Sequence, residues 1–163
     1  MNKDLLHTYN GSVQFLLAGN ATGHILKVIE VFNPGHIEIF TSPQLRSSVN
    51  DFIMSLTKYK GTHHVQSIPS FTESSILSGI SIISDRYKVV KANYPDRKIY
   101  FGITGGTNTM AVTMAITALL FGEKMHYVVK DLNDEDDFGK LIMFDSEAIC
   151  NSLDGVFSRR VNK

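Results

Sequence analysis

Two glycines followed by three hydrogen-bonding side chains form the part of this sequence best suited to ligand chemistry. Gly105 and Gly106 precede Thr107, Asn108 and Thr109. Because glycine has no Cβ, the backbone at these positions can adopt positive φ and approach a ligand closely. The polar residues can cap a helix, whose free N–H groups and positive dipole end attract anions. The sequence therefore predicts a phosphate-binding turn, although any tight connection from a strand to a helix also favours glycine.

The segments on either side of this turn predict a strand before it and an apolar helix after it. Lys98–Ile103 has strand character, and a helix opened near Thr109 should end at Gly122. Met110–Leu120 is apolar on nearly every side, and such a helix must be covered all round. Met114 is expected to pack in a core or an interface.

A second loop near the N-terminus has the same chemistry. Val13–Ala18 is a short apolar run of strand type, and helical periodicity begins at Ile25. The loop between them consists of Gly19, Asn20, Ala21, Thr22, Gly23 and His24. In a doubly wound sheet of order 3-2-1-4-5-6, the first and fourth strands are neighbours. We therefore expect both loops to meet at the carboxyl edge of the sheet.

The rest of the chain alternates between strand and helix patterns, which is typical of the α/β class. The further strands expected are His36–Phe40, Thr62–Ile68, Lys124–Val129 and Lys140–Phe144. Two further helices are expected, one capped by Ser42 and running from Pro43 to about Lys58, the other starting at the capping box 70–73 and ending at Pro95. We predict a Rossmann-like three-layer α/β/α sandwich with a mainly parallel, roughly six-stranded sheet.

Composition supports a single domain over residues 1–163. The chain has 163 residues, of which 43% are hydrophobic and 20% charged, enough for one full core. Its 16 basic and 16 acidic residues cancel, which argues against binding along long nucleic acid. No apolar stretch reaches the roughly 20 residues that cross a bilayer, and no signal peptide is evident, so we expect a cytoplasmic protein.

Several other candidate sites fail on residue type or spacing. The acidic run 131–137 resembles a calcium loop, but Asp136 and Ile142 occupy the positions that need glycine and glutamate. It is more typical of a solvated hairpin turn. His63 and His64 are adjacent on a predicted strand and point to opposite faces, so they cannot chelate one metal. Cys150 lies in a late helical pattern and is expected to be a small buried hydrophobe. We predict neither a metal nor a cofactor.

The segment from Ile103 to Ala111, with its flanking strands and apolar helix, resembles the second motif of CARF domains, the CRISPR-associated Rossmann-fold sensors of type III systems. The resemblance implies a homodimer that binds a cyclic oligoadenylate, most readily cyclic tetra-adenylate, across its two-fold axis. A dimer partner would also cover part of the apolar helix. The candidate ligand-binding residues are Gly19, Asn20, Ala21, Thr22, Gly23, His24, Thr104, Gly105, Gly106, Thr107, Asn108 and Met110.

The motif departs from the family at two positions. Relatives usually read Gly-Gly-Thr-Lys-Pro-Met, whereas this chain has Asn108 and Thr109 in place of lysine and proline. A lysine there would face the phosphates and, in relatives that cut the ring, stabilise developing charge. The substitution leaves ligand binding in place and removes a group useful for cleavage.

Three readings of function remain open. The chain could be a sensor acting through a fused or separate effector, a stand-alone ring nuclease that uses the ribose 2′-hydroxyl as nucleophile, or an unrelated Rossmann-type mononucleotide-binding protein. Catalytic residues are not identified. His24 is the only titratable residue in either loop, and a capping or packing role is favoured over that of general acid.

Overall fold

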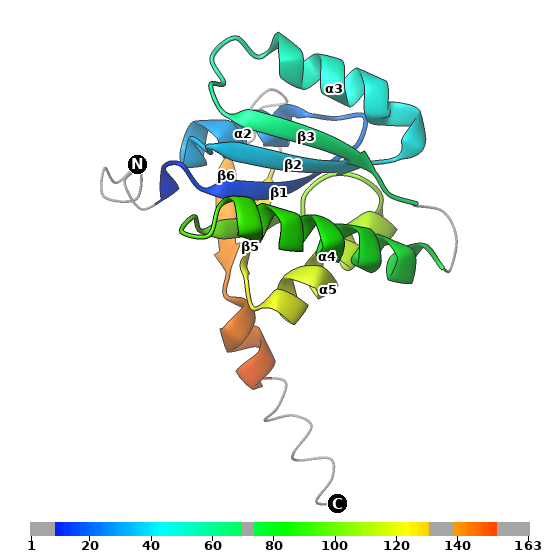
Figure 1. Cartoon of the computed structure of the whole chain (residues 1–163), viewed down its shortest axis with the longest axis vertical. Helices are drawn as coiled ribbons and strands as arrows, with labels where there is room; N and C mark the ends of the chain where they lie inside the picture. Colours follow the sequence, from blue (N-terminus) through cyan, green and yellow to red (C-terminus); the bar gives the residue numbers. More distant parts are fainter. Residues whose placement is uncertain (1–8, 70–73, 131–138, 153–163) are drawn as a thin grey trace, which may run out of the picture.

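The computed structural model describes residues 9–69, 74–130 and 139–152 of the chain. Its centre is a six-stranded sheet in the order β3-β2-β1-β4-β5-β6 (Figure 1). The strands are β1 (Val13–Ala18), β2 (His36–Thr41), β3 (Thr62–Ser67), β4 (Ile99–Gly102), β5 (Lys124–Val129) and β6 (Lys140–Phe144). All neighbouring strands pair in parallel except β5 and β6, which pair antiparallel. The predicted strand order and sheet class are confirmed.

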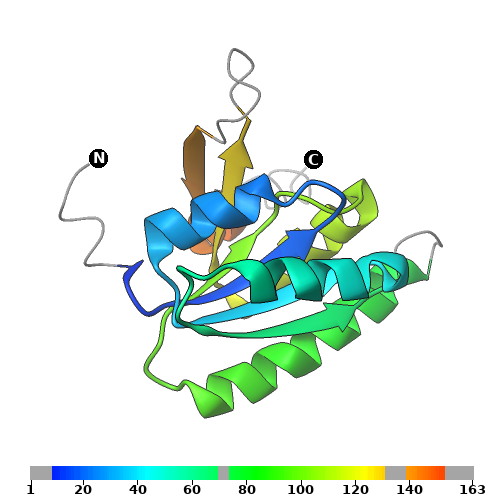
Figure 2. The same cartoon turned by 90° about the horizontal axis from the view of Figure 1, so that it is seen from above.

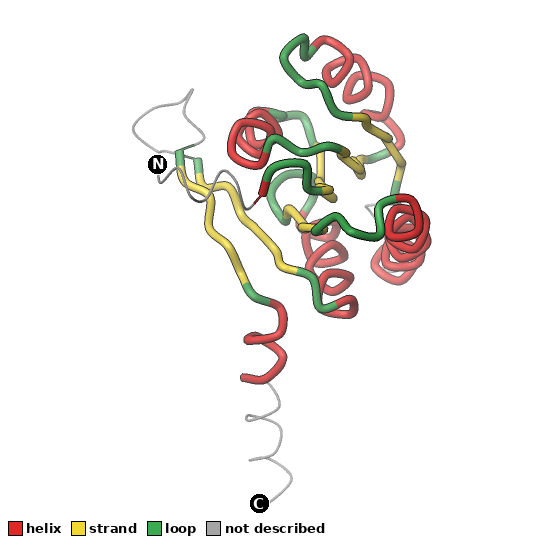
Figure 3. The backbone as a smooth tube through the Cα atoms, turned by 60° about the vertical axis from the view of Figure 1, so that its left-hand side comes forward, coloured by secondary structure: helices red, strands yellow, loops and turns green. Residues whose placement is uncertain are grey.

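Helices cover both faces of the sheet. They are α2 (Gly23–Phe32), the 3-10 helix η1 (Pro43–Leu45), α3 (Arg46–Ser55), α4 (Ser75–Asn93) and α5 (Asn108–Phe121), and residues 146–152 are also helical. Helices α2 and α3 lie on one face, and α4 and α5 lie on the other (Figures 1 and 2). The β5–β6 hairpin and the helix after it extend to one side of this body (Figure 3). The predicted three-layer sandwich is therefore confirmed.

Side chains that alternate along the central strands build one core on each face. Phe15 and Leu17 of β1 pack into the core beneath α4 and α5, whereas Leu16 and Ala18 pack into the core beneath α2 and α3. All six residues of β1 are buried. This is why a central parallel strand appears in the sequence as a nearly continuous apolar run.

Two predicted helix features differ from the structure. The hydroxyl of Ser42 makes no capping hydrogen bond, and Pro43 begins a short 3-10 helix instead of the first turn of α3. Helix α3 ends at Ser55, before the predicted Lys58, because the chain tightens there and the Leu56 amide donates to the Ile53 carbonyl at 3.1 Å. The predicted capping box 70–73 and acidic run 131–137 lie outside the described residues.

Helices α4 and α5 run side by side in the same direction. A Cβ on Gly79 would lie 2.7 Å from Cγ2 of Thr113, so glycine allows the two helices to approach closely near their N-termini. Further along, the rings of Tyr87 and Phe121 stack with centroids 4.0 Å apart. Met114 is fully buried, which places it in the core and not on an interface.

Part of the outer surface of these two helices is apolar. Leu77 is 74% exposed on α4, and Val112 and Leu120 are 46% and 66% exposed on α5. The sheet and α4 therefore leave Val112 and Leu120 of α5 uncovered within the described chain. In the part of the chain that the structure describes, no helix combines the length and the hydropathy needed to cross a membrane.

Candidate functional site

The two glycine-containing loops meet where β1 and β4 end. These strands are neighbours in the sheet, with Val13 opposite Ile99. A Cβ on Gly19 would lie only 3.2 Å from the backbone nitrogen of Gly106. The loops therefore touch backbone to backbone at the carboxyl edge, as the sequence predicted, and a side chain at Gly19 would crowd that contact.

The Gly-Gly turn has the backbone geometry of an anion site. Gly105 and Gly106 adopt φ of 93° and 67°, which a residue with a Cβ rarely adopts. Thr107 is the N-cap of α5, and its hydroxyl accepts a hydrogen bond from the Met110 amide at 3.3 Å. Among the described residues, the amides of residues 105–109 have no hydrogen-bond acceptor. This leaves a run of donors at the positive end of a helix.

Asn108 is not the helix cap. Thr107 holds that position, and Asn108 is the exposed first residue of α5. Its side chain is therefore available at the rim of the turn.

The buried His24 of the first loop packs against the Gly-Gly turn of the second. Its Nε2–H donates to the carbonyl oxygen of Leu17 at 2.8 Å, and a Cβ on Gly105 would lie 2.6 Å from the same nitrogen. The ring is 3% exposed. Burial lowers the pKa of His24, and the hydrogen bond to Leu17 opposes that shift only in part. A buried, neutral imidazole fits the predicted packing role better than that of a general acid.

Two further predicted residues support the turn from inside. Met110 is 1% exposed, and its thioether packs beneath Gly106, where an added Cβ would lie 3.0 Å from Cε. The hydroxyl of Thr104 accepts a hydrogen bond from the Val128 amide at 2.7 Å, which ties the turn to β5. These side chains position the backbone and leave ligand contact to the exposed residues around them.

The first loop is anchored at its start and open at its tip. The buried Thr41, at the end of β2, donates its hydroxyl hydrogen to the Ala18 carbonyl at 2.9 Å. Asn20 and Ala21 are exposed, and Thr22 makes no side-chain capping bond to α2. The side chains of Asn20 and Thr22 have no hydrogen-bond partner among the described residues and can therefore reach a ligand.

Neither loop contains a lysine, an arginine or a carboxylate. The first turns of α2 and α5 also lack acidic residues. Within these two loops, attraction for an anion therefore comes from backbone amides and helix dipoles.

A buried polar pair connects β1 with β5 next to Phe32 of α2, and the sequence analysis missed it. His126 of β5 donates its Nε2–H to the side-chain oxygen of Gln14 at 2.9 Å, and Gln14 donates in turn to Ser12 at 3.0 Å. The other ring nitrogen of His126 is buried without a hydrogen-bond partner among the described residues. Burial lowers the pKa of His126 to about 3, so the ring is neutral. The only sequence signal was a polar residue inside each of two apolar strands.

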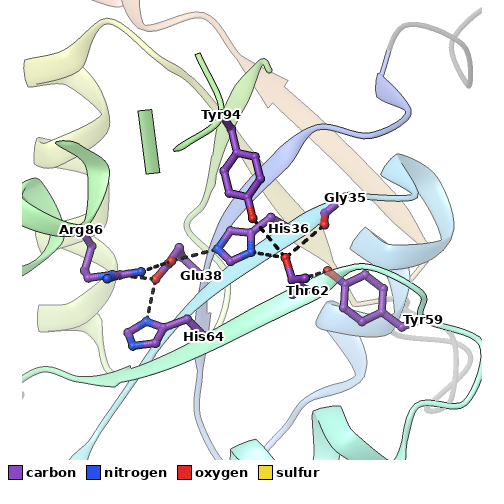
Figure 4. Close-up of polar contacts among 8 residues, drawn as sticks. All are labelled: Gly35, His36, Glu38, Tyr59, Thr62, His64, Arg86 and Tyr94. Atoms are coloured by element: carbon purple, nitrogen blue, oxygen red, sulfur yellow. Dashed lines mark hydrogen bonds and ion pairs between the residues drawn. The ribbon is translucent and has the colours of Figure 1, made fainter. Parts of the chain in front are cut away.

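A second group of charged side chains lies between β2, β3 and α4 (Figure 4), and the sequence analysis did not connect its members. Glu38 is fully buried, and its carboxylate accepts hydrogen bonds from His36 and His64, each at 2.9 Å. Arg86 of α4 donates to the same carboxylate through Nε at 3.1 Å and through Nη2. We call these four residues the Glu38 cluster.

The Glu38 cluster is electrostatically satisfied. Burial alone would raise the pKa of Glu38, but the hydrogen bonds from His36, Arg86 and His64 outweigh it and hold the pKa below its ordinary value. His36 also bonds the Thr62 hydroxyl at 2.7 Å, which links β2 to β3. This arrangement ties α4 to the sheet.

The described residues contain no cluster of three or more histidine, cysteine or acidic side chains that could hold a metal. His63 and His64 do not converge, since His64 is held by Glu38.

The sequence matches no protein-family model and no curated protein. The fold matches solved structures. Csm6 from Enterococcus italicus, bound to cyclic hexa-2′-fluoro-hexa-dAMP, has a TM-score of 0.62 and 16% identity, over 76% of this chain and 35% of Csm6. Can2 from Sulfobacillus thermosulfidooxidans, in complex with cyclic tetra-adenylate, has a TM-score of 0.60 and 15% identity, over 74% of this chain and 32% of Can2. VC1899 from Vibrio cholerae has a TM-score of 0.63 and 11% identity, over 83% and 36% of the two chains.

This chain spans about a third of the length of these three proteins. At such identities the likeness concerns the fold. Two of the three structures were solved with a cyclic oligonucleotide bound. The chain therefore has the Rossmann-like fold of these proteins, and the resemblance to CARF domains inferred from the Gly-Gly-Thr turn is confirmed as a resemblance of fold.

Proposed function

We propose that this chain binds a cyclic oligoadenylate, with cyclic tetra-adenylate as the first candidate, across the two-fold axis of a homodimer. It would serve, as one domain over residues 1–163, as the sensory part of a type III CRISPR antiviral response in the cytoplasm. The observation that carries this proposal is the direct contact of two glycine-containing loops beside a run of free amides. Fold likeness to Csm6 and Can2, whose structures contain such rings, supports the choice of ligand.

The chemistry of the site suits a small polyanion. The amides at residues 105–109 and the positive ends of α2 and α5 attract phosphate without any cationic side chain. Asn20 and Thr22, on the open first loop, have the donors and acceptors to reach adenine edges or ribose hydroxyls. In this proposal the second loop holds the backbone of the ring and the first loop reads its nucleosides.

The dimer in this proposal uses the apolar outer surface of α4 and α5. Leu77 and Val112 lie near the N-termini of these helices, and Asn108 stands at the rim of the turn just before Val112. A second copy placed there would cover apolar surface and bring two pairs of loops around one ring. An even-membered ring can share the two-fold axis of such a dimer.

Binding is favoured over cleavage because the site offers no evident acid or base. His24 is buried, neutral and engaged with Leu17, and the other loop residues do not titrate. A ring nuclease could still act through positioning alone, so the decisive measurement follows the fate of the ligand.

The test is incubation of the purified chain with cyclic tetra-adenylate and with cyclic hexa-adenylate, followed by separation of bound, intact and linear species. We expect one intact ring bound per dimer. Linear product with a 2′,3′-cyclic phosphate end would show that the chain is a ring nuclease instead of a sensor. Failure to bind either ring, combined with binding of a mononucleotide, would contradict the proposal.

A further inference from the structure

A cavity of about 610 Å³ lies away from the two loops, between the start of α3 and the edge strand β3. Its polar lining consists of Arg46, Ser47 and Asn50 from α3 and His63 and His64 from β3. We call it the edge pocket. Its volume is within the range of sites that hold small molecules, roughly 300–1,000 Å³.

Four of these polar side chains are not engaged with the protein. Within the described part of the chain, Arg46, Ser47, Asn50 and His63 form no side-chain hydrogen bond, and Arg46 forms no ion pair. All four can donate hydrogen bonds, and guanidinium matches the geometry of phosphate oxygens. Three exposed side chains of α3 and the half-buried His63 of β3 thus present hydrogen-bond donors to one open pocket.

His64 is held in place by the Glu38 cluster. Its Nδ1–H donates to the buried Glu38 carboxylate at 2.9 Å, and its other ring nitrogen points away from Glu38 (Figure 4). The His64 side chain is 36% exposed. This hydrogen bond turns the His64 ring toward Glu38 and the α4 face of the sheet, so the donors on the α3 face are those of Arg46, Ser47, Asn50 and His63.

The electrostatics of the edge pocket favour an anion. No aspartate or glutamate lines it. Burial lowers the pKa of His63, and the neighbouring His36 and His64 lower it further, which means that added positive charge is disfavoured there until a negative group is present. An anion would offset both effects.

We propose that the edge pocket binds the phosphate group of a small phosphorylated molecule of mononucleotide size, at a site separate from the two loops. Arg46 and His63 contact the phosphate, and Ser47 and Asn50 complete its hydrogen bonds. The proposal does not depend on cyclic oligoadenylate binding, because it shares none of its residues with the loops.

The test uses inorganic phosphate and 5′-AMP as probes, with calorimetry for binding and NMR for the histidine rings. In the Gly106→Val background, where the loop site is blocked, we expect saturable 5′-AMP binding that Arg46→Gln weakens about tenfold or more. Saturation should raise the pKa of His63. Lys98→Gln, which removes the same charge just before the central strand β4, should leave binding unchanged.

The two probes distinguish a phosphate site from a nucleotide site. Equal affinity for inorganic phosphate and 5′-AMP means that the pocket holds phosphate alone, and tighter 5′-AMP binding means that it also holds the nucleoside; either result supports the proposal. It is overturned if neither probe binds saturably to the Gly106→Val protein, or if Arg46→Gln binds as well as the protein with Arg46.

Discussion

The two loops and the Glu38 cluster are both polar regions inside the same sandwich, and they differ in whether their groups have partners. In the loops, small residues expose backbone amides that no described residue accepts from. In the Glu38 cluster, a buried carboxylate is surrounded by an arginine and two histidines that satisfy it. Satisfied groups hold a fold together, whereas unsatisfied donors at a surface are available for a ligand.

The same comparison explains why the two regions are built from different residue types. A cluster that holds α4 against the sheet needs long side chains that reach across elements, such as Arg86. A turn that brings backbone close to a phosphate needs the reverse, since any Cβ at Gly105 or Gly106 would meet His24 or Met110. Charged side chains are therefore concentrated in the Glu38 cluster, where they stabilise the fold. Glycines are concentrated in the loops, where they give a ligand access to the backbone.

The largest expected effect on stability comes from removing the buried carboxylate. Glu38→Ala leaves Arg86 and two histidines without their acceptor, and we expect a loss of about 3–5 kcal/mol in the free energy of unfolding. Glu30→Ala, which breaks an exposed pair with Lys27, should cost about 0–1 kcal/mol. Chemical denaturation measures both, and equal losses would show that the cluster is not structural.

The role of Glu38 can also be tested through the dependence of stability on pH. The pKa of Glu38 is lower in the folded chain than its ordinary value of 4.5, so the carboxylate stabilises the fold fully above that pH. Its contribution is lost as the pH falls through the folded pKa. Stability of Glu38→Gln, followed by denaturation across this range, should decline less steeply on acidification than that of the unaltered chain.

The largest expected effect on ligand binding comes from the turn. Gly106→Val places a β-branched residue at φ of 67°, against Met110, and should abolish binding of cyclic oligoadenylate by calorimetry while the protein stays folded. Gly122→Val is the matched control, because Gly122 has φ of 66° and open space around its Cβ position. It should show the cost in stability of positive φ and keep full affinity. Undiminished affinity in Gly106→Val would rule out the phosphate turn.

A charge on the exposed side of α5 and a charge on its buried side should have different effects. Val112→Glu places a charge on the apolar outer surface, and we expect a folded protein whose dimer and ring binding are both weakened, by roughly tenfold or more. Analytical ultracentrifugation at micromolar concentration checks the first effect and calorimetry the second. Met114→Glu would instead unfold the chain, because Met114 is fully buried. A Val112→Glu protein that dimerises normally would place the interface elsewhere.

A gain in affinity is expected from adding a charge to the neutral loops. Asn108→Lys should tighten binding of cyclic tetra-adenylate by about 1.5–3 kcal/mol through a charge-assisted phosphate contact, and should steepen the salt dependence. Because Thr107 caps α5, the substitution costs no cap, and only an unfavourable dipole contact of about 0.3–1 kcal/mol remains in the free protein. Thermal melts with and without the ring measure both terms. A lower melting temperature with an unchanged ligand-induced shift would show that position 108 does not face the phosphates.

The sequence by itself determined the strand order and the two loops. Apolar runs such as Val13–Ala18 and the period-two strand at His36 are local signals, and the Gly105–Gly106 pair after a strand marks a turn with positive φ. Strand and helix alternation then leaves few arrangements of a parallel sheet, because crossover connections have one hand. The meeting of Gly19 with Gly106 followed from that topology.

Only the tertiary structure decided which side chains form hydrogen bonds with one another. Glu38 and Arg86 are 48 positions apart, and His126 and Gln14 are 112 apart, so no local pattern could pair them. The same holds for the unpaired donors of the edge pocket and for Met114, whose burial depends on how α5 is rotated against the sheet. An almost uniformly apolar helix carries no signal of that rotation, and packing against α4 and β4 sets it.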